Sequence, residues 1–150
     1  MVKGYGYSVW YVPENFLELQ TTYNITHIPH VTYQTNFDDF NSALKFYQQL
    51  PSNITIDFDT NVTLFPQMYS SDPLRACGFY ITKSPYLNPS FNPHMSTKYF
   101  KPENEREINE YLNQMEKYDK PFQINCFKAI SDNRNLDAST WSLLISCRSI

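Results

Sequence analysis

Two short stretches of the chain place a histidine two residues before a hydroxyl side chain. Residues 29–32 read PHVT and residues 93–96 read PHMS, and together they hold two of the three histidines in the sequence. In an extended strand, residues i and i+2 lie on the same face, so each histidine shares a face with the hydroxyl that follows it. Two unrelated structural histidines are the alternative, but recurrence of the whole four-residue pattern favours a functional pair.

The residue types in this pattern suit acid–base chemistry on a phosphate ester. One of His30 and His94 can take a proton while the other gives one. The hydroxyls of Thr32 and Ser96 can donate hydrogen bonds to phosphate oxygens. We predict these four as the catalytic residues, with the acid and the base unassigned, and interpret His27 as a structural or solvated loop residue. No carboxylate cluster has the spacing of a metal site, so we predict neither a metal nor a cofactor.

Composition restricts the classes of protein and of ligand that are compatible with the chain. The 150 residues are 41% hydrophobic and 17% aromatic, which predicts one packed domain, and the net charge is −3. An acidic chain is a poor partner for a long nucleic acid, whereas a short oligonucleotide can bind by stacking on aromatic rings. No stretch is long and apolar enough to suggest a membrane span. The cysteines Cys77, Cys126 and Cys147 lie in apolar contexts and predict buried free thiols in a reducing, cytoplasmic compartment.

Alternating and β-branched patterns predict a chain rich in strands. The predicted strands cover residues 5–12, 30–34, 54–58, 62–65, 75–82, 94–99, 122–130 and 139–147. Residues 59–61 (DTN) have turn chemistry and would make a hairpin of the third and fourth of these strands. Further turns are predicted at residues 70–73 and 131–135, and the proline-rich residues 84–93 predict a linker.

Three helices are predicted between the strands. They cover residues 14–20, 38–50 and 102–118. Asn36 or Asp38 is expected to cap the second helix, and Pro102 to open the third. In the second, apolar residues recur with the i, i+3, i+4, i+7 spacing of an amphipathic helix.

The same element order occurs twice. Each half runs motif strand, helix, strand, turn, strand, with the halves at about 1–83 and 84–150 of a single domain. This predicts an α+β fold of two pseudo-twofold-related lobes of antiparallel sheet with the helices outside. One histidine from each half would then meet the other in a central cleft.

These motifs resemble those of the 2H phosphoesterase superfamily, which includes bacterial LigT-type RNA 2′,3′-cyclic phosphodiesterases. Other stretches share in the resemblance: an opening strand that ends in proline (YSVWYVP, 7–13), a mid-chain LFP at 64–66, and FNP at 91–93 just before the second histidine. The resemblance covers the whole chain and implies a metal-independent phosphodiesterase with the LigT-like fold.

Within the superfamily the chain looks most similar to the viral branch. That branch comprises 2′,5′-phosphodiesterases of coronaviruses and toroviruses and the C-terminal domain of the rotavirus capping protein. The resemblance implies cleavage of 2′,5′-oligoadenylate, antagonism of host RNase L, a place in the host-cell cytoplasm, and an origin in a larger viral polyprotein. The alternatives are a cyclic phosphodiesterase acting on RNA 2′,3′-cyclic or ADP-ribose 1″,2″-cyclic phosphate, and a catalytically silent domain that binds a nucleotide or a protein.

Aromatic residues near the motifs are candidates for stacking on adenine. They are Tyr7, Trp10 and Tyr33, with ordinary packing as the alternative for each. We assign Trp10 and Trp141 to the core.

Basic substrate contacts are predicted from the resemblance. Relatives often carry an arginine three residues beyond the second hydroxyl, where this chain has Tyr99. The nearest basic residues are Lys98 and Lys101, which are therefore the predicted substrate contacts.

Overall fold

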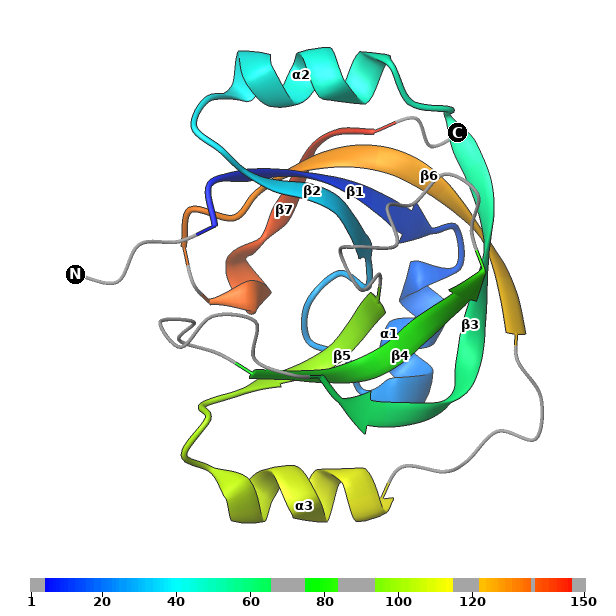
Figure 1. The fold of residues 1–150 in the computed structure, drawn as a ribbon, viewed down its shortest axis with the longest axis vertical. Coiled ribbons are helices and arrows are strands. Elements are labelled where there is room, and N and C mark those ends of the chain that lie inside the picture. Colours follow the sequence, from blue (N-terminus) through cyan, green and yellow to red (C-terminus); the bar gives the residue numbers. More distant parts are fainter. Residues whose placement is uncertain (1–4, 66–74, 84–93, 115–121, 136, 147–150) are drawn as a thin grey trace.

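The computed structural model describes residues 5–65, 75–83, 94–114, 122–135 and 137–146. The fold is α+β, as predicted (Figure 1). In chain order the elements are β1 (Tyr7–Pro13), α1 (Phe16–Tyr23), β2 (Val31–Phe37), α2 (Phe40–Gln48), β3 (Asn53–Leu64), β4 (Arg75–Lys83), β5 (His94–Phe100), α3 (Glu105–Gln114), β6 (Phe122–Asp132) and β7 (Ser142–Ser146), with a short 3-10 helix (Ala138–Thr140) before β7. No helix in these ranges is long and apolar enough to cross a membrane.

The strands form one sheet whose pairings close into a ring. The order is β1-β2-β5-β4-β3-β6-β7, and β1 also pairs with β6. All pairings among the described strands are antiparallel. Along one edge of β6, β3 pairs with residues 122–127 and β7 with residues 129–132. In Figure 1, α2 lies above this ring of strands and α3 below it.

The predicted repeat is matched in the ring by two strands of each half, and the last strand of the second half, β7, does not take the place that β4 has in the first. Strand β2 pairs with β5, and β3 pairs with β6, which joins equivalent strands of the two halves. In the first half, β4 lies between β3 and β5. The equivalent place, between β6 and β2, is occupied by β1. The strand that completes the second half of the ring therefore comes from the start of the chain.

The hairpin predicted around residues 59–61 is wrong. Residues 53–64 form the single strand β3, and the strand that returns along it is β4. Phe58 pairs with Ile81 and Val62 with Phe79, so three residues of β3 face one residue of β4. The turn-forming residues are accommodated as a bulge within a continuous strand. The predicted turn at 70–73, the linker at 84–93 and the last residues of the third helix, 115–118, lie outside the described residues.

The helix boundaries also differ from prediction by a few residues: α1 covers 16–23 instead of 14–20, and α2 covers 40–48 instead of 38–50. Asp39 caps α2, its carboxylate accepting a 2.8 Å hydrogen bond from the backbone N–H of Ser42. Asn36, one of the expected caps, adopts a left-handed backbone with φ of 65°. Helix α3 begins at Glu105, and Pro102, which was expected to open it, lies in the turn that precedes it.

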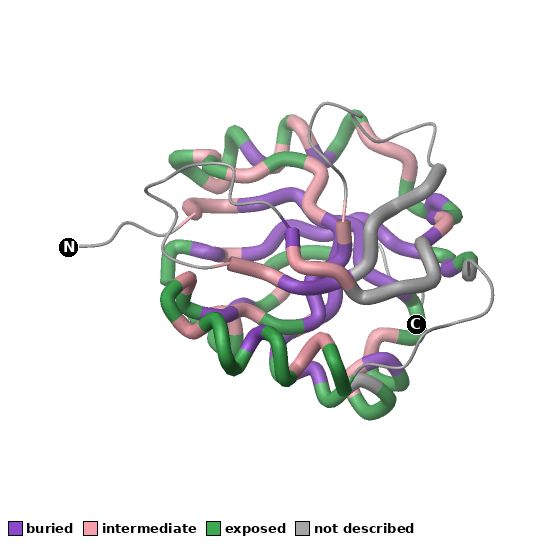
Figure 2. Tube along the Cα trace, turned by 60° about the horizontal axis from the view of Figure 1, so that its bottom comes forward, coloured by how far each residue is buried: buried purple, intermediate pink, exposed green. Residues whose placement is uncertain are grey.

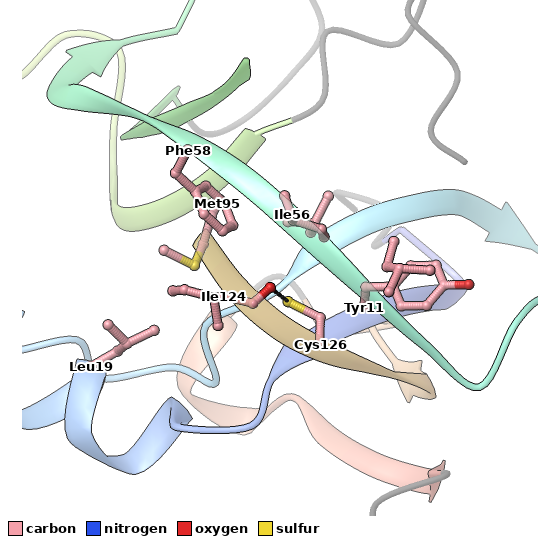
Figure 3. Packing of buried hydrophobic residues seen from close by; sticks show 9 residues of the cluster. Tyr11, Leu19, Ile56, Phe58, Met95, Ile124 and Cys126 are labelled. Carbon is pink, nitrogen blue, oxygen red and sulfur yellow. Dashed lines mark hydrogen bonds between the residues drawn. The ribbon is translucent and has the colours of Figure 1, made fainter. Parts of the chain in front are cut away.

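Buried apolar side chains come chiefly from the strands, and exposed positions lie towards the periphery (Figure 2). The largest cluster gathers residues of five strands and α1 (Figure 3) and comprises Tyr11, Leu19, Val31, Ile54, Ile56, Phe58, Met95, Ile124 and Cys126. Cys77 and Cys126 are buried free thiols, as predicted, and burial raises the pKa of Cys77 to about 11 and that of Cys126 to about 12. Cys147 lies outside the described residues.

Candidate active site

The two motif strands are neighbours in the sheet. Strands β2 and β5 pair antiparallel, with Val31 opposite Met95, and both side chains are fully buried in the central cluster. Side chains alternate across a strand, so the residues flanking this pair point to the other face. Extending this register by one residue in each direction predicts His30 across from Ser96 and Thr32 across from His94. One strand pairing thus brings together the two segments that carry the predicted catalytic residues.

The ring of His30 is enclosed by other rings. His30 is only 4% exposed. The indole of Trp10 stacks on it, with centroids 3.5 Å apart and planes 9° apart. Trp141 and His27 approach its ring at 5.9 Å in edge-on geometry. Because Trp10 pairs with Thr32 across β1 and β2, the sheet register itself sets the indole beside the first motif.

One nitrogen of His30 is already bonded. Its Nδ1 lies 2.7 Å from the carbonyl oxygen of Ile28. A carbonyl only accepts, so Nδ1 carries the hydrogen and the neutral ring keeps a lone pair on Nε2. Burial is the main cause that holds the pKa of His30 well below 6.5; electrostatic interaction with His27 and His94 acts in the same direction, and the bond to Ile28 opposes it. His30 is therefore a neutral imidazole at pH 7 with Nε2 ready to accept a proton.

His27 is buried beside the same site, so of its two predicted interpretations the structure supports the structural one. It is 3% exposed, and its Nε2 donates to the carbonyl oxygen of Ser96 at 2.9 Å. Its own carbonyl accepts from Gln20 Nε2 at 2.9 Å, and Tyr99 meets its ring edge-on at 5.1 Å. Burial lowers the pKa of His27 to about 4, although the bond to Ser96 acts in the opposite direction.

The two motif hydroxyls have free hydrogen-bonding capacity within the described part of the chain. Thr32 is half-buried and Ser96 is 3% exposed, and neither side-chain oxygen bonds to another described residue. Nearby hydroxyls behave differently. Ser8 and Thr35 bond each other at 2.7 Å, and Thr97 donates to a carbonyl of β4 at 3.1 Å. The hydroxyls of Thr32 and Ser96 can therefore donate to a ligand without breaking a bond of this kind.

His94 is more accessible than His30. It is half-buried at the start of β5, and the ring of Phe65 lies 4.3 Å from its own. Electrostatic interaction with His94 is one of the causes that lower the pKa of His30, so the two motif histidines influence each other. Their environments differ, which is the condition for one to act as a base and the other as an acid.

The predicted aromatic contacts Tyr7 and Tyr33 are not placed with the histidines. Tyr7 packs edge-on against Phe40 of α2, and the guanidinium of Arg134 lies 5.0 Å from its ring. Tyr33 packs against Phe46 of α2 at 5.6 Å. Both rings join the cluster that lies under α2.

The predicted basic contacts also lie apart from the motif side chains. The ammonium of Lys98 sits 5.1 Å from the ring of Phe100 and 5.4 Å from that of Tyr111, on the side of α3. Lys101 is exposed beyond the end of β5.

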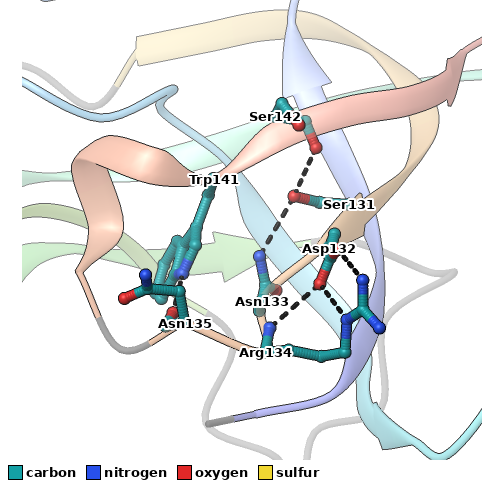
Figure 4. A network of polar contacts seen from close by, with 7 residues as sticks. All are labelled: Ser131, Asp132, Asn133, Arg134, Asn135, Trp141 and Ser142. Atoms are coloured by element: carbon teal, nitrogen blue, oxygen red, sulfur yellow. Dashed lines mark hydrogen bonds and ion pairs between the residues drawn. The ribbon is translucent and has the colours of Figure 1, made fainter.

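The core assignment of Trp10 and Trp141 is confirmed, since they are 1% and 7% exposed. Sequence reasoning missed that both pack on His30. A polar network around the β6–β7 connection positions Trp141 (Figure 4): its Nε1 donates to the carbonyl of Asn135 at 2.6 Å. Nearby, Asn133 bonds Ser131, whose hydroxyl donates to the first residue of β7.

Comparison with known proteins adds no assignment: no protein-family model and no curated protein matches the chain. Within the described ranges, no three histidine, cysteine or carboxylate side chains come together as a metal site would require. What the fold and the site define is an α+β protein with two histidine–hydroxyl pairs on adjacent strands.

Proposed function

We propose that this protein is a metal-independent phosphodiesterase with the 2H fold, and that its substrate is a short 2′,5′-linked oligoadenylate. The observation that supports the proposal is the antiparallel pairing of β2 and β5 at Val31 and Met95, because each of these residues directly follows one of the motif histidines. Loss of 2′,5′-oligoadenylate would deprive host RNase L of its activator, in keeping with the resemblance to the viral branch.

In this proposal His30 is the general base. It is neutral, and Nε2 is the nitrogen left for chemistry because Nδ1 bonds to Ile28. In a 2′,5′ linkage the free 3′-hydroxyl is adjacent to the scissile phosphate. Nε2 takes the proton of that hydroxyl while the 3′-oxygen forms a bond to phosphorus.

His94 is then the general acid. Its greater exposure suits a group that must be protonated from solvent before each turnover. It gives its proton to the departing 5′-oxygen as the phosphorus–oxygen bond breaks, so the products are a 2′,3′-cyclic phosphate and a free 5′-hydroxyl. The hydroxyls of Thr32 and Ser96 donate to the non-bridging oxygens, where negative charge develops.

A second candidate is hydrolysis of a small cyclic phosphate, such as an RNA 2′,3′-cyclic end or ADP-ribose 1″,2″-cyclic phosphate. The 4% exposure of His30 favours it, because a small substrate needs less room around that ring. The same residues would act, with water in place of the 3′-hydroxyl.

The test compares 2′,5′-linked with 3′,5′-linked triadenylate and with both cyclic phosphates, each in the presence of a chelator. The variants are His30→Asn and His94→Ala. Asparagine at position 30 keeps a nitrogen donor near Ile28 but removes Nε2. A loss of activity in this variant can therefore be attributed to the missing Nε2 instead of to a lost structural bond. We expect cleavage of only the 2′,5′ isomer, with kcat reduced at least about 100-fold in each variant.

Other outcomes have distinct meanings. Turnover of the cyclic phosphates alone selects the second candidate. Activity that the chelator abolishes, or that survives both substitutions, refutes the proposed mechanism. Binding without turnover of any substrate would identify a silent binding domain.

A further inference from the structure

The junction between the two motif strands has little backbone pairing of its own. Within the described ranges, β2 and β5 are paired at Val31 and Met95 alone. Their outer neighbours are paired at several positions, from Tyr7 to Tyr11 between β1 and β2 and from Arg75 to Tyr80 between β4 and β5. The sheet places the two motifs next to each other but holds them by little direct pairing, so a contact outside the sheet can add to their positioning.

His27 supplies a link across this junction. It belongs to the loop that leads into β2, yet its Nε2 donates to the backbone carbonyl of Ser96 on β5. The loop is held in turn by Gln20 of α1, which donates to the carbonyl of His27. The ring has little freedom, because it is 3% exposed and packs edge-on against His30 and Tyr99.

We propose that His27 is a positioning residue for the phosphodiesterase reaction: its Nε2–H···O=C bond to Ser96 fixes the second motif relative to His30. The inference rests on the function proposed above. The bonded carbonyl belongs to the same residue as the motif hydroxyl, so a shift of that peptide moves the hydroxyl away from the phosphate oxygens. A misplacement of about 1 Å at a catalytic group is enough to cost about 100-fold in rate.

The imidazole of His27 also has to be electrically neutral. When His30 takes the proton of the substrate it becomes an imidazolium, and its ring centroid is 5.9 Å from that of His27. A positive charge on His27 would oppose that proton transfer through the low dielectric of the buried cluster. Of the described titratable groups, those that meet the ring of His27 are His30 and Tyr99, and no carboxylate is among its partners.

Two substitutions separate the bond from the packing. His27→Phe keeps a ring and removes the donor, whereas His27→Gln keeps a neutral N–H donor of similar reach. We expect kcat to fall about 10- to 100-fold in the phenylalanine variant, with KM changed less than about threefold, and kcat to return to within about threefold of wild type in the glutamine variant.

Tyr11→Phe is the matched control. Tyr11 also donates a 2.9 Å bond from its side chain to a backbone carbonyl, that of Pro51, and belongs to the central cluster rather than to the site. The control should lower Tm without changing kcat. The inference would be overturned if His27→Phe kept the wild-type kcat, or if His27→Gln lost as much kcat as His27→Phe.

A readout without substrate tests the bond itself. The ¹⁵N NMR spectrum of histidine-labelled protein at pH 7 should show His27 as the neutral Nε2–H tautomer with slow exchange of that hydrogen. An active enzyme whose His27 is charged or carries its hydrogen on Nδ1 would refute the positioning role and leave the proposed function standing. A correct tautomer in a protein that cleaves none of the substrates would refute the proposed function, and the catalytic role of His27 with it.

Discussion

Acid should destabilise this protein well before its carboxylates are protonated, because the fold buries neutral imidazoles. In the unfolded chain His27 has its ordinary pKa of 6.5, whereas in the folded protein burial lowers that pKa to about 4. Between these values the unfolded state binds more protons, so the free energy of unfolding falls as the pH falls. The stability contributed by the neutral ring is complete above about pH 6.5 and is lost as the pH drops towards 4.

The size of the effect follows from the two pKa values. Between pH 7.5 and pH 5 the unfolded chain gains nearly a full proton at His27 and the folded protein gains about a tenth of one. Integrated over this interval, the free energy of unfolding falls by about 2 kcal/mol because of His27 alone. His30, whose pKa is also lowered by burial, adds a loss in the same direction.

The assay is urea unfolding at pH 7.5, 6.5, 5.5 and 5.0, with wild type and His27→Gln in parallel. Glutamine does not titrate, so the wild type should lose about 2 kcal/mol more than the variant over this range. The Asp39, Asp132 and Asp137 carboxyls have lowered pKa values and titrate below the range in both proteins. Parallel stability curves for the two proteins would refute the claim that His27 is buried and neutral.

Two further substitutions test the framework around the site. Lys128 is buried, and its ammonium donates to the carbonyls of Tyr47 and Leu50 at the end of α2, at 2.8 and 3.0 Å. Because Lys128→Met removes both bonds, it should lower the free energy of unfolding by about 1–3 kcal/mol in urea titrations. An unchanged urea midpoint would contradict this. A Cβ on Gly78 would lie 2.0 Å from the backbone oxygen of Met95. Gly78→Ala should therefore push β4 away from β5 and lower the free energy of unfolding by about 1–3 kcal/mol, with a lowered kcat if the proposed function holds. A Gly78→Ala protein with the Tm of the wild type would show that the two strands separate without cost.

Much of the fold could be predicted because strand and helix periods are local properties of the sequence. The aromatic and β-branched run of β1 and the alternation of Ile54, Ile56 and Phe58 mark buried faces, and both occur in strands. The hairpin at residues 59–61 failed because turn chemistry is also compatible with a bulge, and the choice depends on a distant partner strand. Likewise Asp38 and Asp39 are equally good caps in the sequence, and only the path of the chain decides between them.

In the candidate site, too, features set by neighbouring residues could be predicted from the sequence, and features set by contacts between distant residues could not. The histidine–hydroxyl pairs could be recognised because their spacing fixes a shared face. The stacking of Trp10 on His30 could not, because it depends on the register between two strands separated by a helix and a loop. The bond from His27 to Ser96 joins residues almost seventy positions apart, and a single histidine in a loop carries no signal of such a partner.

The place of β1 in the ring has a consequence for how the chain folds. Trp10 pairs with Ala129, more than a hundred residues later, and through β2 the same strand supports the first motif. Closing so long a loop costs chain entropy before the paired strands return any stability, which slows folding. During synthesis one edge of β1 can pair with β2, but its other edge stays open until β6 has been made. The distant pairing of β1 with β6 is thus expected to be a slow step of folding, and the open edge of β1 is a site where another chain could pair in the meantime.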